Sequence, residues 1–212
     1  MSLLHSFTFN LFSENTYIVA DADGQAAIID PGCMDAAEQQ ELQAFIADRA
    51  LKPVLLLNTH CHIDHVLGNR FVYDTYGLQP WIHAADEKDL NRLESYGPVF
   101  GIRAVASPAP AGYLKDGEEL AVGKLRFELR EAPGHSAGSI CFVNHEEGYV
   151  ISGDVLFAGS IGRTDLPGGN YATLIQSVKS QLFSLPNEMV VHPGHGPATT
   201  IGHEKQTNPF FQ

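Results

Sequence analysis

The chain has 212 residues, of which 44% are hydrophobic and 18% are charged, and its formal net charge at pH 7 is −12. This composition supplies enough apolar side chains for a buried core and argues against a disordered chain. The acidic balance disfavours binding to nucleic acid or to an anionic membrane surface, because like charges repel. We therefore expect a single folded domain over residues 1–212.

The N-terminal residues and the cysteines indicate in which cellular compartment the protein is expected. MSLLHSFTFNLFSEN contains neither a basic segment nor a long apolar run, so we expect no signal peptide. No apolar run approaches the ~20 residues that a membrane helix needs. The three scattered cysteines, Cys33, Cys61 and Cys141, do not form a disulfide framework. Together these features predict a cytoplasmic protein.

The first half of the chain alternates between strand and helix patterns. Asp35 is a suitable N-cap for a helix that runs to about Ala50, with apolar residues at helical spacing. PVLLLNTH is nearly all apolar, which is typical of a strand buried on both faces. The elements expected are strands at 3–12, 15–21, 26–30, 53–60 and 80–86, helices at 35–50, 65–77 and 86–95, and a Gly- and Pro-rich loop at 97–112.

The second half follows a similar outline. Strands are expected at 123–134 and, as a hairpin that turns at His145–Gly148, at 139–154. A helix is expected at 170–185 and a last strand at 187–196. Two β-rich halves that each carry helices predict the α+β class, as a four-layer αββα sandwich of two mixed sheets with outer helices.

A dense histidine motif lies where the buried strand at 53–60 ends. The segment NTHCHIDHVLGN contains His60, His62, Asp64 and His65 within six positions. His60 and His62 share one side of an extended stretch, and Cys61 points to the other, so the thiol is a weaker candidate for a metal ligand than its neighbours.

Three more metal-binding side chains follow strands in the second half. His135 occurs in APGHSAGS, Asp154 in VISGDVLF and His195 in VVHPGHG, each beside a glycine. Any one of them alone is more often a surface or core residue, but the first cluster makes all three candidates together. The other histidines, His5, His83, His145, His192 and His203, lack such settings, and His192 is the one that could support a ligand from outside.

These seven residues favour a catalytic metal site. Imidazole and carboxylate suit zinc, iron or manganese, and the lack of thiolates argues against a structural zinc site. Seven ligands suffice for two divalent ions if one carboxylate bridges them, and zinc is the metal we expect first. Two ions about 3.5–4 Å apart can share a water and lower its pKa toward about 7, which produces a bridging hydroxide nucleophile.

The motifs THCHIDH (59–65), APGHS (132–136), SGDVLF (152–157) and PGHG (193–196) resemble those of the metallo-β-lactamase superfamily, in the same order. The resemblance implies a sandwich with the metals at one edge between the two sheets. By this resemblance His60, His62 and His135 would hold the first ion, and Asp64, His65 and His195 the second. Asp154 would then bridge the two ions.

GDVLFAGSIGRTDLPGGN (153–170) resembles the glyoxalase II group, the hydroxyacylglutathione hydrolases, in a short bacterial form. The resemblance implies hydrolysis of a small-molecule thioester such as S-D-lactoylglutathione. Asp64 would also have a catalytic role, because it can accept a hydrogen bond from the nucleophile. About seventeen residues follow His195, so the C-terminal domain that holds glutathione in longer relatives is not expected. Arg163 and Lys205 are candidate contacts for an anionic substrate, although Arg163 could instead bond to Asp165.

Several alternatives stay open at this point. An iron-dependent persulfide dioxygenase would share the fold, the ligands and the GRTD segment, and a lactonase or another hydrolase would share the site. A binding module without catalysis is the remaining class. The sequence does not determine the oligomeric state, and Phe210 and Phe211 could pack on the core or on a partner.

Overall fold

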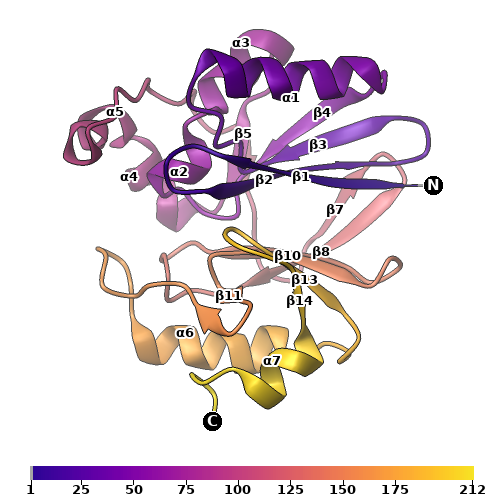
Figure 1. The fold of residues 1–212 in the computed structure, drawn as a ribbon, viewed down its shortest axis with the longest axis vertical. Helices are drawn as coiled ribbons and strands as arrows, with labels where there is room; N and C mark the ends of the chain where they lie inside the picture. Colours follow the sequence, from indigo (N-terminus) through magenta and orange to yellow (C-terminus); the bar gives the residue numbers. More distant parts are fainter. Residues whose placement is uncertain (1) are drawn as a thin grey trace. The chain divides into compact units, whose positions relative to one another are not determined.

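The computed structural model describes residues 2–212 of the chain (Figure 1). The chain divides into two compact units. The first contains the chain up to Tyr113 together with Ala121–Leu125, and the second contains Leu114–Leu120 and Arg126–Gln212. Each unit has its own mixed sheet and its own helices, and the expectation of one domain over 1–212 stays a prediction.

The first unit is built on a six-stranded sheet in the order β1-β2-β3-β4-β5-β6. Strands β1 to β3 are antiparallel, whereas β3, β4, β5 and β6 run parallel. The strands are Leu3–Phe9, Glu14–Ala20, Gln25–Ile29, Lys52–Leu57, Pro80–Ile82 and Gly112–Tyr113. The carboxyl ends of the parallel strands β3 and β4 therefore lie side by side, which brings the residues after them to one edge of the sheet.

Helices α1 (Ala36–Asp48) and α3 (Asn69–Tyr76) lie on the same face of this sheet (Figure 1). The predicted cap is confirmed, because the Asp35 carboxylate accepts from the backbone N–H groups of Ala37 and Glu38. The buried residues of α1 pack in one cluster with residues of β1 to β4 and with Val72 of α3. The remaining helical elements are α2 (Ile63–Val66), η1 (Ala84–Asp86), α4 (Glu87–Leu90), α5 (Leu93–Tyr96) and η2 (Gly97–Phe100).

The strands expected at 3–12 and 53–60 end at Phe9 and Leu57, and the loop expected at 97–112 begins with η2. Three other predicted elements of this unit also differ from the structure. The helix expected at 65–77 begins earlier, at Ile63, and is interrupted at Gly68, whose added Cβ would lie 2.5 Å from the Cys33 sulfur. The strand expected at 80–86 ends at Ile82, because the His83 ring accepts from the Ala85 N–H and caps a 3-10 turn. The helix expected at 86–95 divides into α4 and α5, where the Arg92 N–H bonds to a carbonyl only three residues back.

The second sheet, whose strands lie in the second unit except for part of β7 and the first residue of β8, has six strands in the order β14-β13-β10-β9-β8-β7. Strands β10 and β13 are parallel, and the neighbours β9–β10, β8–β9 and β13–β14 are antiparallel. The strands in chain order are Glu119–Val122, Leu125–Glu131, Ile140–Asn144, Tyr149–Gly153, Val190–Pro193 and Thr199–Thr200. A small hairpin of β11 (Leu156–Phe157) and β12 (Ser160–Ile161) follows β10.

Helices α6 (Tyr171–Ser177) and α7 (Ile201–Thr207) cover one face of the second sheet (Figure 1). The predicted helix at 170–185 is confirmed, and its last part, η3 (Val178–Leu182), is wound as a π-helix. Leu174, Val178 and Leu182 pack with the apolar residues of β9, β10 and β13. Phe211 packs on the same cluster with its ring 4.8 Å from that of Phe183, whereas Phe210 is exposed. Within residues 2–212, no helix has the length and apolarity to cross a bilayer.

Candidate metal centre

The first group of predicted ligands lies just after β4. His62 is the N-cap of α2, and Asp64 and His65 are on the single turn of that helix. The loop is fixed from beneath by Asn58, whose amide donates to the His65 carbonyl at 3.1 Å and accepts from the Asn69 amide at 3.0 Å. A buried polar network of this kind holds the ligand-bearing turn rigid.

The side chains of this group converge within the first unit. The rings of His60 and His65 are buried with centroids 4.1 Å apart, and the His60 and His62 centroids are 4.8 Å apart. His65 Nε2 lies 3.6 Å from Asp64 Oδ2, which is longer than a hydrogen bond. Ligand atoms at about 2.0–2.2 Å from a tetrahedral ion lie about 3.3–3.6 Å from one another, so this separation suits two ligands of one metal.

A buried aspartate that the sequence analysis did not single out orients His65. Asp30 accepts from the Thr59 N–H at 2.7 Å and the Thr59 hydroxyl at 2.5 Å, and its Oδ2 is 3.1 Å from His65 Nδ1. Because a carboxylate only accepts, Nδ1 carries the ring proton and Nε2 carries the lone pair that a metal needs. Asp30 also has φ +49°, a strained backbone conformation of the kind found at functional sites.

A second buried acid lies near the same ring. Glu14 is fully buried, its Oε2 accepts from the Thr16 hydroxyl at 2.9 Å, and its Oε1 is 3.9 Å from His65 Nδ1. Burial raises the pKa of Glu14 well above its usual range, and His65 opposes this shift. Gly32 is required beside it, because an added Cβ would lie 2.0 Å from the Glu14 carboxylate.

The second group of predicted ligands converges within the second unit. His135 and Asp154 are buried, and His195 is partly exposed. Asp154 Oδ2 lies 3.4 Å from His135 Nε2 and 3.5 Å from His195 Nε2. Both separations match the spacing of neighbouring ligands around a tetrahedral ion. These separations suit three ligands of one ion, and they also suit an aspartate shared between two ions.

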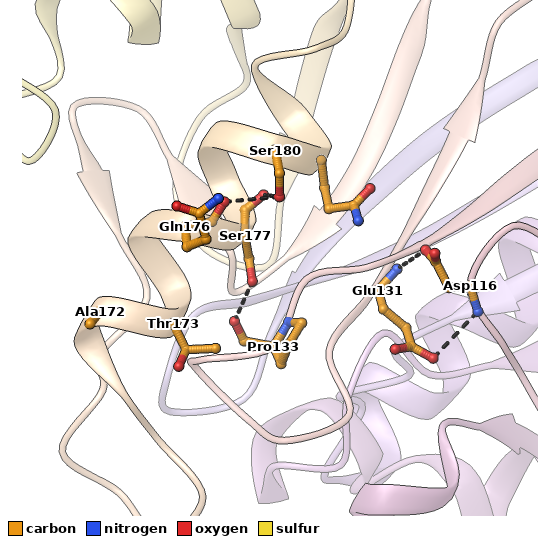
Figure 2. Close-up of a pocket in the computed structure, with 9 residues that line it drawn as sticks. Asp116, Glu131, Pro133, Ala172, Thr173, Gln176, Ser177 and Ser180 are labelled. Atoms are coloured by element: carbon orange, nitrogen blue, oxygen red, sulfur yellow. Dashed lines mark hydrogen bonds between the residues drawn. The ribbon is translucent and has the colours of Figure 1, made fainter.

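His135 is held by the turn on which it lies. Its Nδ1 donates to the Arg163 carbonyl at 2.8 Å, so Nε2 is the ring nitrogen with the lone pair. Figure 2 shows the support beneath this turn, where the Ser177 hydroxyl of α6 donates to the Pro133 carbonyl at 2.7 Å. Gly134 has φ +130°, and an added Cβ there would lie 2.3 Å from the Leu174 backbone, so only glycine fits.

Asp154 and His195 are brought together by the parallel pairing of β10 and β13. Each follows the end of its strand, and the register shifts by one residue between Ile151 and Gly153. The Gly194 N–H bonds to the Gly153 carbonyl at 2.8 Å, just beyond this irregularity. The two ligands thus follow neighbouring strand ends, as expected for a site at the carboxyl edge of a parallel pair.

The other residues considered from sequence have different environments. Cys61 is buried in an apolar cluster, and its burial raises the pKa of the thiol well above the usual range. Arg163 makes a bidentate pair with Asp165, at 2.8 Å for both contacts, which lowers the pKa of Asp165 to about 2. The Lys205 ammonium donates to Asn187 at 2.9 Å and to a backbone carbonyl. His192 packs edge-on against Tyr149.

The donor chemistry of both groups fits divalent metal ions. Each group combines imidazole and carboxylate at ligand spacing, and in each a histidine is fixed by a hydrogen bond from its other ring nitrogen. Asp30, His60 and His65 also bring potential ligand atoms within 4.8 Å of one another, but the Asp30 oxygens already accept from Thr59 and His65. We therefore assign Asp30 to orientation of His65.

The chain belongs to the metallo-β-lactamase superfamily, whose family model matches residues 10–195. Its sequence is 38% identical to hydroxyacylglutathione hydrolase GloC of Haemophilus influenzae over 204 residues, which cover 94% of this chain and 93% of the relative. The fold is similar to that of the BLEG-1 B3 metallo-β-lactamase crystal structure, with a TM-score of 0.91 and 32% sequence identity. The match covers 99% of this chain and 100% of that chain.

A second solved relative is TTHA1623 in a di-iron-bound form, with a TM-score of 0.88, 37% identity and coverage of 97% of this chain and 99% of that one. The predicted α+β class and metallo-β-lactamase fold are thereby confirmed. The chain is a metallo-hydrolase of this superfamily.

Proposed function

We propose that this chain is a thioester hydrolase of the glyoxalase II type that uses two divalent metal ions. The seven residues His60, His62, Asp64, His65, His135, Asp154 and His195 would hold them, with Asp154 as the shared ligand. The observation that carries the proposal is the spacing of Asp154 Oδ2 between the two imidazole nitrogens, at 3.4 and 3.5 Å. The similarity to hydroxyacylglutathione hydrolase GloC supports S-D-lactoylglutathione as the substrate.

When bound, the metal ions would lower the pKa of a water molecule and polarise the carbonyl of the substrate. The chain's own residues prepare the site for this chemistry. Asp30 and the Arg163 carbonyl fix His65 and His135 with Nε2 deprotonated. Asp64 would accept a hydrogen bond from the attacking water and orient it. A thiolate is a good leaving group, so little help from a protein acid is needed.

The test is steady-state hydrolysis of S-D-lactoylglutathione by protein loaded separately with zinc, iron or manganese. We expect turnover that Asp154→Ala abolishes, whereas Asp48→Ala, which removes an exposed carboxylate from α1, retains it. The metal content of both variants is measured in the same preparations. A fully loaded protein without turnover of this thioester contradicts the proposal for this substrate.

Two alternatives are measured with the same preparations. The di-iron form of TTHA1623 shows that a relative accepts iron, and iron also fits a persulfide dioxygenase. Oxygen uptake with glutathione persulfide by the iron-loaded protein would favour that activity over hydrolysis. The similarity to BLEG-1 makes a β-lactam the appropriate second substrate, and a lactone tests the remaining hydrolase class.

A further inference from the structure

The second unit contains a buried carboxylate outside the predicted ligands. Glu204 of α7 is fully buried, and its Oε2 accepts from the Gly159 N–H at 3.0 Å and the Asn208 amide at 2.7 Å. Its Oε1 accepts from the Thr199 hydroxyl at 2.6 Å. All three donors are neutral. A carboxylate buried without a cation is unfavourable unless such bonds satisfy it, so its position has a structural or functional reason.

One of these contacts holds the hairpin of β11 and β12 directly, and a second holds it through Asn208. The strands pair at only two positions, Leu156 with Ile161 and Phe157 with Ser160, and so short a hairpin is marginal by itself. Glu204 holds the backbone of its turn at Gly159, which has φ +68°. The Asn208 amide donates in addition to the carbonyl of Ser160 at 3.0 Å. The hairpin is therefore anchored to α7 at its turn and at the start of its second strand.

The two ends of this hairpin lead directly to the metal-binding group. Asp154 lies two residues before β11, and Arg163 lies two residues after β12 and accepts from His135 Nδ1 at 2.8 Å. Gly162 packs between them, since an added Cβ would lie 1.9 Å from the Asp154 carbonyl and 2.9 Å from His135 Nδ1. A shift of the hairpin would therefore move Asp154 and the carbonyl that orients His135.

We propose that Glu204 is a positioning residue that keeps Asp154 and His135 at ligand spacing through the β11–β12 hairpin. This inference rests on the proposed metal site. The competing explanation is that Glu204 only joins α7 to β14 through Thr199. The two explanations can be distinguished by mutation, because Oε2 of Glu204 contacts Gly159 and Asn208, whereas Oε1 contacts Thr199.

Four variants distinguish them. Glu204→Ala removes the three bonds that the carboxylate accepts. Asn208→Ala keeps the carboxylate but removes the amide's bonds to the Ser160 carbonyl and to Glu204 Oε2, and the bond that it accepts from the Phe210 N–H. Glu204→Gln can keep the hairpin contacts through its amide oxygen, while its amide nitrogen donates to Thr199, whose hydroxyl can turn to accept. Thr199→Val removes only the contact on the β14 side. Glu188→Gln, an exposed site in the same unit, is the matched control.

The measurements are zinc affinity by competition with a chelator and the visible spectrum of the cobalt-loaded protein, neither of which requires a substrate. We expect Glu204→Ala and Asn208→Ala to weaken zinc binding about 10–100-fold and to alter the cobalt spectrum. Glu204→Gln, Thr199→Val and Glu188→Gln should stay close to wild type in both. Should Glu204→Ala fail to fold, Asn208→Ala still tests the anchoring of the hairpin, at Ser160 rather than at Gly159.

The inference is overturned if Asn208→Ala and every folded Glu204 variant bind metal as the wild type does. It is also overturned if Thr199→Val weakens zinc binding as much as Asn208→Ala, because loss of stability would then explain both. A wild-type protein that binds no metal contradicts instead the proposed function, so the two failures are distinguishable.

Discussion

Replacement of Asp30 by asparagine tests whether the orientation of His65 governs metal binding. The carboxylate of Asp30 accepts three hydrogen bonds, from the Thr59 N–H, the Thr59 hydroxyl and His65 Nδ1. In Asp30→Asn, Oδ1 still accepts from the Thr59 N–H, but an NH₂ group replaces Oδ2. The Thr59 hydroxyl can rotate to accept from it, whereas His65 can accept only as the other tautomer, with its proton on Nε2. That tautomer offers no lone pair to the metal.

The expected magnitudes follow from these contacts. Each of the three hydrogen bonds changes from a charge-assisted to a neutral bond, which lowers the stability of the folded protein by about 1 kcal/mol per bond. Removal of the buried charge of Asp30 offsets part of this loss of stability. We expect Asp30→Asn to lower the free energy of unfolding of the metal-free protein by about 2–3 kcal/mol. Zinc affinity should fall about 10–100-fold. Urea titration and chelator competition measure the two effects, and wild-type zinc affinity in Asp30→Asn would refute the tautomer argument.

Three further outcomes are expected. Ser177→Ala should destabilise the protein by about 1–2 kcal/mol in urea, because the partly buried Pro133 carbonyl loses its donor. Ser180→Ala, in an exposed position of η3 three residues further along, should change stability by less than about 0.5 kcal/mol. Burial lowers the pKa of His192 from 6.5, so the unfolded chain binds more protons than the folded chain just below pH 6.5. The free energy of unfolding should therefore fall with decreasing pH more steeply in the wild type than in His192→Asn. Parallel plots of this free energy against pH for the two proteins would contradict the prediction. The three buried cysteines should react with a thiol reagent only after unfolding, because burial raises the pKa of each thiol, to about 12 for Cys141. Rapid reaction of the folded protein would contradict this, because it would show an accessible thiol.

Much of the fold and the candidate ligands could be predicted because their signals are local. The strands β4 and β10 are mainly apolar, and the His60 motif and Asp154 follow directly after them. The motif around His60 places four ligands within six residues, so their proximity needs no knowledge of the tertiary structure. That these four converge with His135, Asp154 and His195 on one site stays a prediction.

The residues that support the ligands were not predicted, for a physical reason. Asp30 acts through Thr59 and His65, which are about 30 residues further along the chain, and Glu204 acts through Gly159, 45 residues earlier. Spacing along the sequence carries no information on such contacts. Asp30 could still have been found, because it ends an apolar strand just before Pro31-Gly32, the same pattern that identified Asp154.

The register of β10 against β13 affects which mutations in this strand the protein can tolerate. Side chains alternate between the faces of a strand, so loss of one residue from Tyr149–Gly153 would turn every later side chain of that segment to the opposite face. Conservative exchanges such as Val150→Ile keep the alternation and should be accepted. A library of single-residue deletions should therefore show β10 as an intolerant segment even where a library of conservative substitutions shows it as permissive.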